Sequence, residues 1–162
     1  DMGMYYKRRD YSTIVDGHNP IVAHEFLGSD LQGKDVFVYD DMIASGESML
    51  DLAYDLKSRG ARRLFAGCTY SLFTKGIEKF QKAYEEGVIS AVISTNLTYL
   101  RPELRMAPWF YEADLTKYIA YFIAAMNHDV SVGQFLDPHK KIQKLLDEHR
   151  DSRKETQLDL FD

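Results

Sequence analysis

The chain has 162 residues, a formal net charge of −5 at pH 7 and a single cysteine. This length allows one domain with a buried core, and 45% hydrophobic residues indicate a globular chain rather than a disordered one. The charge argues against general nucleic-acid binding, which needs a basic excess, and one cysteine excludes an intrachain disulfide.

The chain contains no apolar run of the roughly 18 residues needed to span a bilayer, and no secretory pattern at its start. We therefore expect a protein that is cytoplasmic and makes no membrane contact. A single domain is predicted over residues 1–149, in which 1–35 form a loop-rich lead-in. The polar residues 150–162 are predicted to be a disordered tail.

The predicted elements alternate between strands and helices. After several glycine and proline breakers we expect a short helix or strand at 21–27. A strand over Val36–Asp40 follows, and its continuous apolar run is typical of a strand covered on both faces. Helices are predicted over 48–59, 74–86 and 114–126, and further strands over 63–70, 89–95 and 106–112. This order predicts an α/β fold with a mostly parallel central sheet flanked by helices.

In the last of these helices, Asp114 is expected to cap the first turn, and four apolar residues are expected to point inward: Leu115, Ile119, Phe122 and Ile123.

The most informative stretch is residues 36–49. Asp40 and Asp41 follow the apolar run, and a loop of mostly small residues then leads into a helix. Ligands of parallel sheets bind beyond the carboxyl ends of the strands, where carboxylates could take ribose hydroxyls. Loop amides and a helix N-terminus could take a phosphate. The alternative is that the two aspartates form a solvated turn and that Ser45 is an ordinary helix N-cap.

Other motifs are absent. No G-x-x-x-x-G-K-[ST] occurs and no G-x-G-x-x-G follows a strand, which argues against P-loop NTPases and dinucleotide dehydrogenases. The five histidines lack metal-ligand spacing, so no protein metal site is predicted. Cys68 lies within a predicted strand and is expected to be a small buried side chain.

The stretch Val36–Met49 resembles the phosphoribosyl-pyrophosphate signature of type I phosphoribosyltransferase folds. The neighbouring motifs occur in the order found in ribose-phosphate pyrophosphokinases; they are Lys7-Arg8-Arg9, Gly33-Lys34-Asp35 and the segments 59–66 and 127–132. The chain is therefore similar, over roughly residues 5–137, to the C-terminal half of those enzymes. A phosphoribosyltransferase-like fold is expected.

The resemblance implies a ribose-phosphate diphosphokinase, which makes phosphoribosyl pyrophosphate (PRPP) and AMP from MgATP and ribose 5-phosphate. It implies that Asp40 and Asp41 bind the ribose hydroxyls and that Lys7 and Arg9 are catalytic cations on a mobile loop within residues 1–35. The substrate's 5-phosphate would be held by Ala44, Ser45, Gly46, Glu47 and Ser48. Mg²⁺ would enter with ATP in the full-length enzyme, which we expect to be a homo-oligomer.

Some features depart from the family pattern. Ala44 stands where an acid is usual, which removes one polar contact to the ribose. Glu47 stands where a glycine is usual, and an anion beside a phosphate is unfavourable unless it points away or pairs with a cation. The segment between Arg9 and Val36 is longer than is typical. Most ATP-binding residues of the family come from an N-terminal half, so we expect this fragment to be inactive alone.

Two other functions remain open from the sequence: a non-catalytic regulatory or binding subunit similar to PRPP synthases, and a base-adding phosphoribosyltransferase. In the tail, Gln157–Phe161 resembles the short peptide that docks into bacterial sliding clamps, although a match of five residues also arises by chance.

Overall fold

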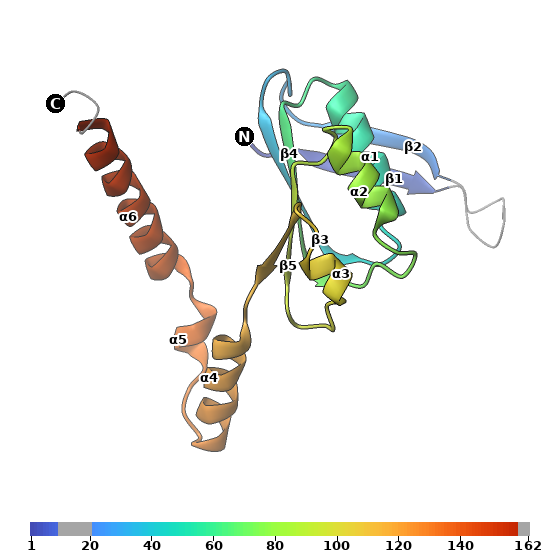
Figure 1. Cartoon of the computed structure of the whole chain (residues 1–162). Coiled ribbons are helices and arrows are strands. Elements are labelled where there is room, and N and C mark those ends of the chain that lie inside the picture. The colour runs from blue at the N-terminus through green and yellow to red at the C-terminus, as the bar shows by residue number, and fades with distance from the viewer. Residues whose placement is uncertain (10–20, 159–162) are drawn as a thin grey trace. The chain divides into compact units, whose positions relative to one another are not determined.

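The computed structural model describes residues 1–9 and 21–158, coloured along the chain in Figure 1. The chain forms two compact units, Asp1–Ala113 and Asp114–Asp162. The first unit contains the sheet and the predicted site, whereas the described part of the second is helical. The sequence predicted one domain over 1–149 with a loop-rich start, and those limits stay a prediction.

The central sheet of the first unit has four strands in the order β3-β4-β5-β6, and all neighbouring strands are parallel. Their bounds are Asp35–Ile43 for β3, Arg63–Ser71 for β4, Ala91–Thr95 for β5 and Phe110–Ala113 for β6. This sheet and its flanking helices confirm the predicted α/β class. Strand β6 begins later than the predicted strand 106–112, because the chain turns after a short helix, α3 (Pro102–Arg105): the N–H of Ala107 donates to Leu104 O and that of Phe110 donates to Ala107 O.

A separate two-stranded antiparallel ribbon precedes the sheet. It consists of β1 (Met4–Arg9) and β2 (Ile21–Leu27), so the segment predicted as helix or strand at 21–27 is a strand. The register pairs Tyr5 with Phe26 and Lys7 with His24. The linking residues 10–20 lie outside the described part of the chain.

Two helices pack on one face of the sheet. Helix α1 (Glu47–Ser58) contributes Ala53, and α2 (Glu78–Glu85) contributes Phe80, to a core that includes Leu64 and Val92 of the strands. Helix α2 begins later than the predicted residue 74, because the chain turns at Gly76, whose φ is +83° and whose N–H donates to Phe73 O. The predicted burial of Cys68 on the same face is confirmed.

The prediction that β3 is covered on both faces is wrong. Val36 and Val38 are partly buried against the core, whereas Phe37 and Tyr39 on the other face are 59% and 65% exposed. Strand β3 is an edge strand of the four-stranded sheet, with β4 as its neighbour. A continuous apolar run does not show which of the two faces meets a helix, because side chains alternate along any strand.

The second unit contains α4 (Thr116–Asn127), α5 (Gly133–Leu136) and α6 (His139–Leu158). The N-cap of α4 is Leu115 rather than the predicted Asp114, whose carboxylate accepts a hydrogen bond from the N–H of Thr116 at 2.9 Å in the turn that leads into the helix. Ile119 and Ile123, expected to point inward, are 42% and 64% exposed, because the described helices of this unit do not enclose α4 on all sides.

Helix α6 includes residues 150–158, for which a disordered tail was expected, and 159–162 lie outside the described residues. Across the described ranges, no helix is both long and apolar enough to cross a membrane.

Candidate functional site

The two predicted ribose-binding aspartates lie inside β3 rather than at its end. The strand continues to Ile43, because Met42 and Ile43 still pair with Tyr70 and Ser71 of β4. Asp40 and Asp41 are exposed, and Asp40 Oδ1 accepts a hydrogen bond from the N–H of Asp41 at 2.8 Å. Successive strand residues alternate between faces. The strand geometry therefore places the two carboxylates on opposite sides rather than together.

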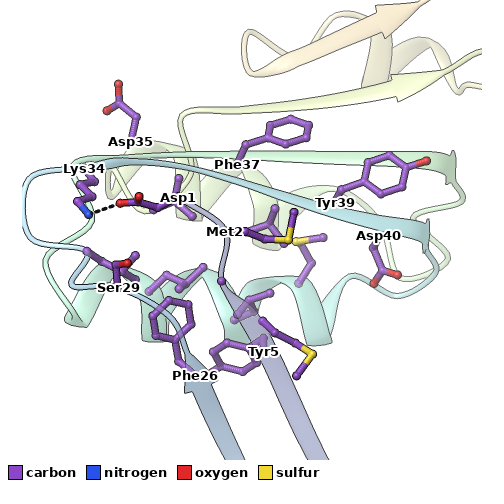
Figure 2. Close-up of a pocket in the computed structure, with 18 of the residues that line it drawn as sticks. Asp1, Met2, Tyr5, Phe26, Ser29, Lys34, Asp35, Phe37, Tyr39 and Asp40 are labelled. Carbon is purple, nitrogen blue, oxygen red and sulfur yellow. Dashed lines mark hydrogen bonds and ion pairs between the residues drawn. The ribbon is translucent and has the colours of Figure 1, made fainter. Parts of the chain in front are cut away.

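A cavity of about 590 Å³ borders Asp40 but not Asp41. It lies among the start of β1, the open edge of β3 and helix α1, and Figure 2 shows Asp40 near one end and the Lys34–Asp1 ion pair near the other. Ser48, the last residue of the predicted phosphate loop, also lines it. Much of the remaining lining is apolar; it includes Met2, Phe26, Val38, Met49, Leu52 and Leu56.

Backbone carbonyl groups at the start of the loop between β3 and α1 accept hydrogen bonds from the segment that follows β4. Ile43 O accepts hydrogen bonds from the N–H groups of Leu72 and Phe73, and Ala44 O accepts one from Thr74 at 2.9 Å. Ser45 Oγ accepts a hydrogen bond from the N–H of Glu47 at 3.5 Å. The bonds from Leu72, Phe73 and Thr74 attach the loop to the segment that follows β4, so that the N-terminus of α1, with its positive dipole end, begins at a defined place.

Gly46 is the N-cap of α1, and its structure explains why glycine stands there. Its φ is +83°, which side chains other than glycine rarely adopt. A Cβ at this position would lie only 2.3 Å from Phe80 Cε2. Phe80 is held by Phe73, 4.9 Å away edge-on, and by Trp109, stacked at 5.8 Å. The tight turn into the helix is therefore set by the aromatic core below it.

Glu47, the unfavourable anion of the predicted loop, is paired with two cations. Its Oε1 lies 3.0 Å from Lys75 Nζ and 3.0 Å from Lys79 Nζ. Hydrogen bonds and charge attraction from both lysines lower the pKa of Glu47. Two ammonium groups, from the turn before α2 and from α2 itself, therefore lie beside the single carboxylate in the first turn of α1, an arrangement that favours an anionic ligand.

Lys75 and Lys79 are site residues that the sequence analysis missed. Both lysines are more than half exposed, at 59% and 61%, and remain accessible to solvent. A signal was present, since the predicted helix 74–86 would have placed two lysines spaced by four on one face, although in the structure Lys75 lies in the turn before α2 and only Lys79 lies in the helix. Their partner at Glu47 is 28 and 32 residues earlier, however, and that distance in sequence hid the pairing.

Hydroxyl side chains gather toward the carboxyl ends of β4 and β5. The hydroxyls of Tyr39 and Thr69 share a hydrogen bond of 2.6 Å, and Thr95 Oγ1 donates to Thr69 O at 2.6 Å. Ser71 Oγ is buried and, among the described residues, has no hydrogen-bond partner.

The single cysteine of the chain is not set up as a nucleophile. Burial raises the pKa of Cys68, which disfavours the thiolate form.

Lys7 and Arg9 lie on strand β1, where Lys7 pairs with His24 and Arg9 with Ile21 across a register shift. Their side chains lie outside the described part of the structure, so their catalytic role stays a prediction. Within the described residues, no group of three or more His, Cys, Asp or Glu side chains gathers to hold a metal ion. These residues offer no protein cage for Mg²⁺, which commonly binds through nucleotide phosphates and water instead.

Comparison with known proteins gives a consistent family resemblance, although no family model matches the chain. A ribose-phosphate pyrophosphokinase of Vibrio cholerae is 28% identical over 133 residues, which cover 82% of this chain and 39% of that protein. One from Thermococcus kodakarensis is 31% identical over 103 residues, 62% of this chain and 34% of the relative. The chain thus spans well under half the length of the curated relatives it matches.

A solved structure of phosphoribosylpyrophosphate synthetase from Mycobacterium smegmatis matches with a TM-score of 0.57 and 20% identity. The match covers 66% of this chain and 34% of that one, and it shows a shared fold. The similarity to ribose-phosphate pyrophosphokinases and the phosphoribosyltransferase-like fold, both predicted from the sequence, are confirmed.

Proposed function

We propose, for a chain similar to ribose-phosphate pyrophosphokinases over most of its length, that the β3–α1 segment binds ribose 5-phosphate. The 5-phosphate would lie at the N-terminus of α1, against the amides of Ala44 to Ser48. The observation that carries this proposal is the pairing of Glu47 with Lys75 and Lys79. It removes the electrostatic objection to a phosphate beside Glu47 and adds positive charge at the same place.

The ribose would lie toward Asp40, beside the cavity along β3. An exposed carboxylate accepts hydrogen bonds from vicinal hydroxyls, and Ser48 at the same cavity offers a further hydroxyl. Because Asp40 and Asp41 alternate along the strand, we propose Asp40 as the main sugar contact. Asp41 would take a second hydroxyl only after the backbone between them turns.

In the whole protein, the proposed reaction is transfer of a diphosphoryl group from MgATP to the anomeric hydroxyl of ribose 5-phosphate, giving PRPP and AMP. Such transfers depend on positioning and on charge stabilisation more than on covalent catalysis. Lys7 and Arg9 would supply cations to the transferring group, and Mg²⁺ bound to ATP would neutralise its phosphate charge. The residues of the described sheet would hold the acceptor sugar.

We propose that this fragment corresponds to the C-terminal half of the enzyme and is inactive alone, because it spans 39% of the Vibrio cholerae relative. We further propose a homo-oligomeric, cytoplasmic whole protein, in keeping with the resemblance. A contact between Gln157–Phe161 and a sliding clamp remains a separate proposal from the sequence. Binding of a clamp to the peptide 150–162, and its loss on Phe161→Ala, would test it.

Titration calorimetry of ribose 5-phosphate into this chain tests the site. We expect saturable binding that Asp40→Asn weakens about tenfold, since a carboxylate accepts stronger hydrogen bonds than an amide. Asp51→Asn is the matched control, because it removes the same charge from an exposed position on α1. No saturable heat with the unmodified chain would contradict the proposed function.

Ala44 supports a second candidate, a non-catalytic subunit that binds the sugar phosphate and regulates a partner. A methyl group there supplies no polar contact to the ribose. The assay that separates the two is AMP release from ATP and ribose 5-phosphate by the whole protein. Binding without AMP release would favour the regulatory subunit.

A further inference from the structure

Four side chains in contact join the β1–β2 ribbon to α1. Tyr5 Oη donates to Asp55 Oδ2 at 2.7 Å, and Arg59 Nε donates to the same oxygen at 2.7 Å. The Arg59 guanidinium lies 5.7 Å from the centre of the Phe26 ring. Phe26 is in turn the register partner of Tyr5, with ring centroids 6.4 Å apart. Two residues of this cluster come from the ribbon, one comes from α1, and Arg59 is the C-cap residue of that helix.

The Phe26 ring packs against two glycines, one just before β1 and one just after β2. A Cβ at Gly28 would lie 2.5 Å from Phe26 Cζ, and one at Gly3 would lie 2.8 Å from Phe26 Cε2. The ring therefore occupies space that side chains at those two positions would take. Figure 2 shows Phe26 and Tyr5 close together beside α1, where the two strands leave the cavity.

The hydrogen bond that Tyr5 donates to Asp55 persists across the physiological pH range. Burial, followed by the hydrogen bond to Asp55, raises the pKa of Tyr5 to about 12. The phenol thus stays protonated and keeps its donor. A single hydrogen bond to a charged acceptor contributes more than one between neutral groups.

Helix α1 connects this cluster of four side chains to the predicted phosphate loop. The helix begins at Glu47, and Asp55 follows eight residues later, about 12 Å along a straight helix axis. On the ribbon, Lys7 follows Tyr5 by two residues on the same strand. A contact that fixes Tyr5 to Asp55 therefore limits where the backbone of Lys7 can lie relative to the loop.

We infer that Tyr5, Phe26, Asp55 and Arg59 are positioning residues that hold the ribbon carrying Lys7 and Arg9 in place relative to the loop at residues 44–48. This inference rests on the proposed function for its catalytic meaning. The physical anchor itself stands on the contacts above. None of the four side chains needs to touch the substrate.

Hydrogen exchange of the backbone amides tests the anchor directly. Tyr5→Phe removes one hydroxyl, and we expect amides of β1 and β2 to exchange about tenfold faster, which is the effect of losing a hydrogen bond to a carboxylate. Tyr54→Phe is the matched control, since Tyr54 Oη donates to Glu86 Oε2 at 2.6 Å and joins α1 to the end of α2 instead. Unchanged exchange in the ribbon of Tyr5→Phe would overturn the inference.

Kinetics of the whole protein test positioning. Tyr5→Phe should lower kcat about tenfold and leave KM for ribose 5-phosphate unchanged, because the sugar site is intact while the cations are misplaced. Asp55→Asn, which keeps an acceptor, should retain more activity than Asp55→Ala. An equal loss in Tyr54→Phe would indicate a general structural effect and would contradict positioning.

The two proposals fail in different ways. If the unmodified protein neither binds ribose 5-phosphate nor releases AMP, the proposed function fails. The exchange experiment then still decides whether the ribbon is anchored. If the unmodified protein is active and Tyr5→Phe changes neither exchange nor kcat, the positioning inference fails and the proposed function stands.

Discussion

Lys75 Nζ lies 3.0 Å from Glu47 Oε1 and so neutralises the anion at the start of helix α1. This ion pair joins the helix after the predicted phosphate loop to the turn before α2. Exposed ion pairs contribute little to stability. We infer instead that this one matters for the charge that a ligand meets at the loop.

Lys75→Gln is expected to weaken the binding of ribose 5-phosphate about threefold to tenfold, because an exposed charge a few ångströms from a phosphate is worth about 1 kcal/mol. Glu47→Gln should change affinity in the opposite direction. Calorimetry at low and high salt measures both, and the differences should shrink as salt screens the charges.

The control for this pair is Lys82→Gln, which removes a lysine from α2 that pairs with Glu86 rather than with Glu47. We expect its affinity for ribose 5-phosphate to match the unmodified chain. An equal loss in Lys82→Gln would show that overall charge, not the position of Lys75, sets the binding.

Gly46→Ala is expected to destabilise the chain by about 3 kcal/mol and to abolish ribose 5-phosphate binding. The new Cβ would meet the Phe80 ring, and the backbone would also be strained at φ +83°. Gly87→Ala isolates the strain, since Gly87 has φ +70° and nothing within 4 Å of its Cβ position. It should cost about 1 kcal/mol. Thermal or urea unfolding measures both, and equal losses would contradict the role of Phe80.

The Tyr5 phenol is expected to lose its proton only at a pH above the ordinary range for tyrosine. Because its pKa is raised from 10.0 to about 12, the folded state favours the protonated phenol. Its contribution to stability is therefore fully present below pH 10 and is lost as pH rises from 10 to 12. Absorbance titration of tyrosinate in the unmodified chain and in Tyr5→Phe should differ by one group that titrates near 12. If the group missing from Tyr5→Phe titrates near 10 instead, the effect of the partly buried hydrogen bond to Asp55 on Tyr5 is contradicted.

Asp35 should contribute to resistance against acid. Hydrogen bonds from Arg63 and Arg62 lower its pKa, so its contribution is present above the ordinary pKa of 3.8 and is lost as pH falls below it. Asp35→Asn should therefore flatten the fall of stability with acid, as measured by urea unfolding between neutral and acidic pH. Asp30→Asn is the control for the loss of one carboxylate, since Asp30 is exposed and has no ion pair among the described residues.

Much of the fold followed from local pattern. Apolar runs and helix punctuation located β4, β5 and α1 to within a few residues, because each is decided by the alternation and spacing of its own side chains. The same local pattern did not reveal that β3 runs on to Ile43. Continuation of a strand past two acids depends on pairing with β4, which the strand's own residues do not encode.

The candidate site divides in the same way. The small-residue loop and the acids before it were visible in residues 36–49, since a loop before a helix is a local feature. The placement of Asp40 and Asp41 on opposite sides of the strand was not foreseen. It follows from a β conformation that persists through both residues.

The sequence by itself determined the alternation of the four sheet strands with helices α1, α2 and α4, the α/β class and the loop that resembles a sugar-phosphate site. Only the tertiary structure decided that Glu47 is neutralised by Lys75 and Lys79, that Gly46 lies against Phe80, and that one face of β3 is exposed. The physical reason is the separation in sequence over which each interaction acts. Propensity and periodicity act between neighbours, whereas ion pairs, close packing and burial join residues that the folded chain alone brings together.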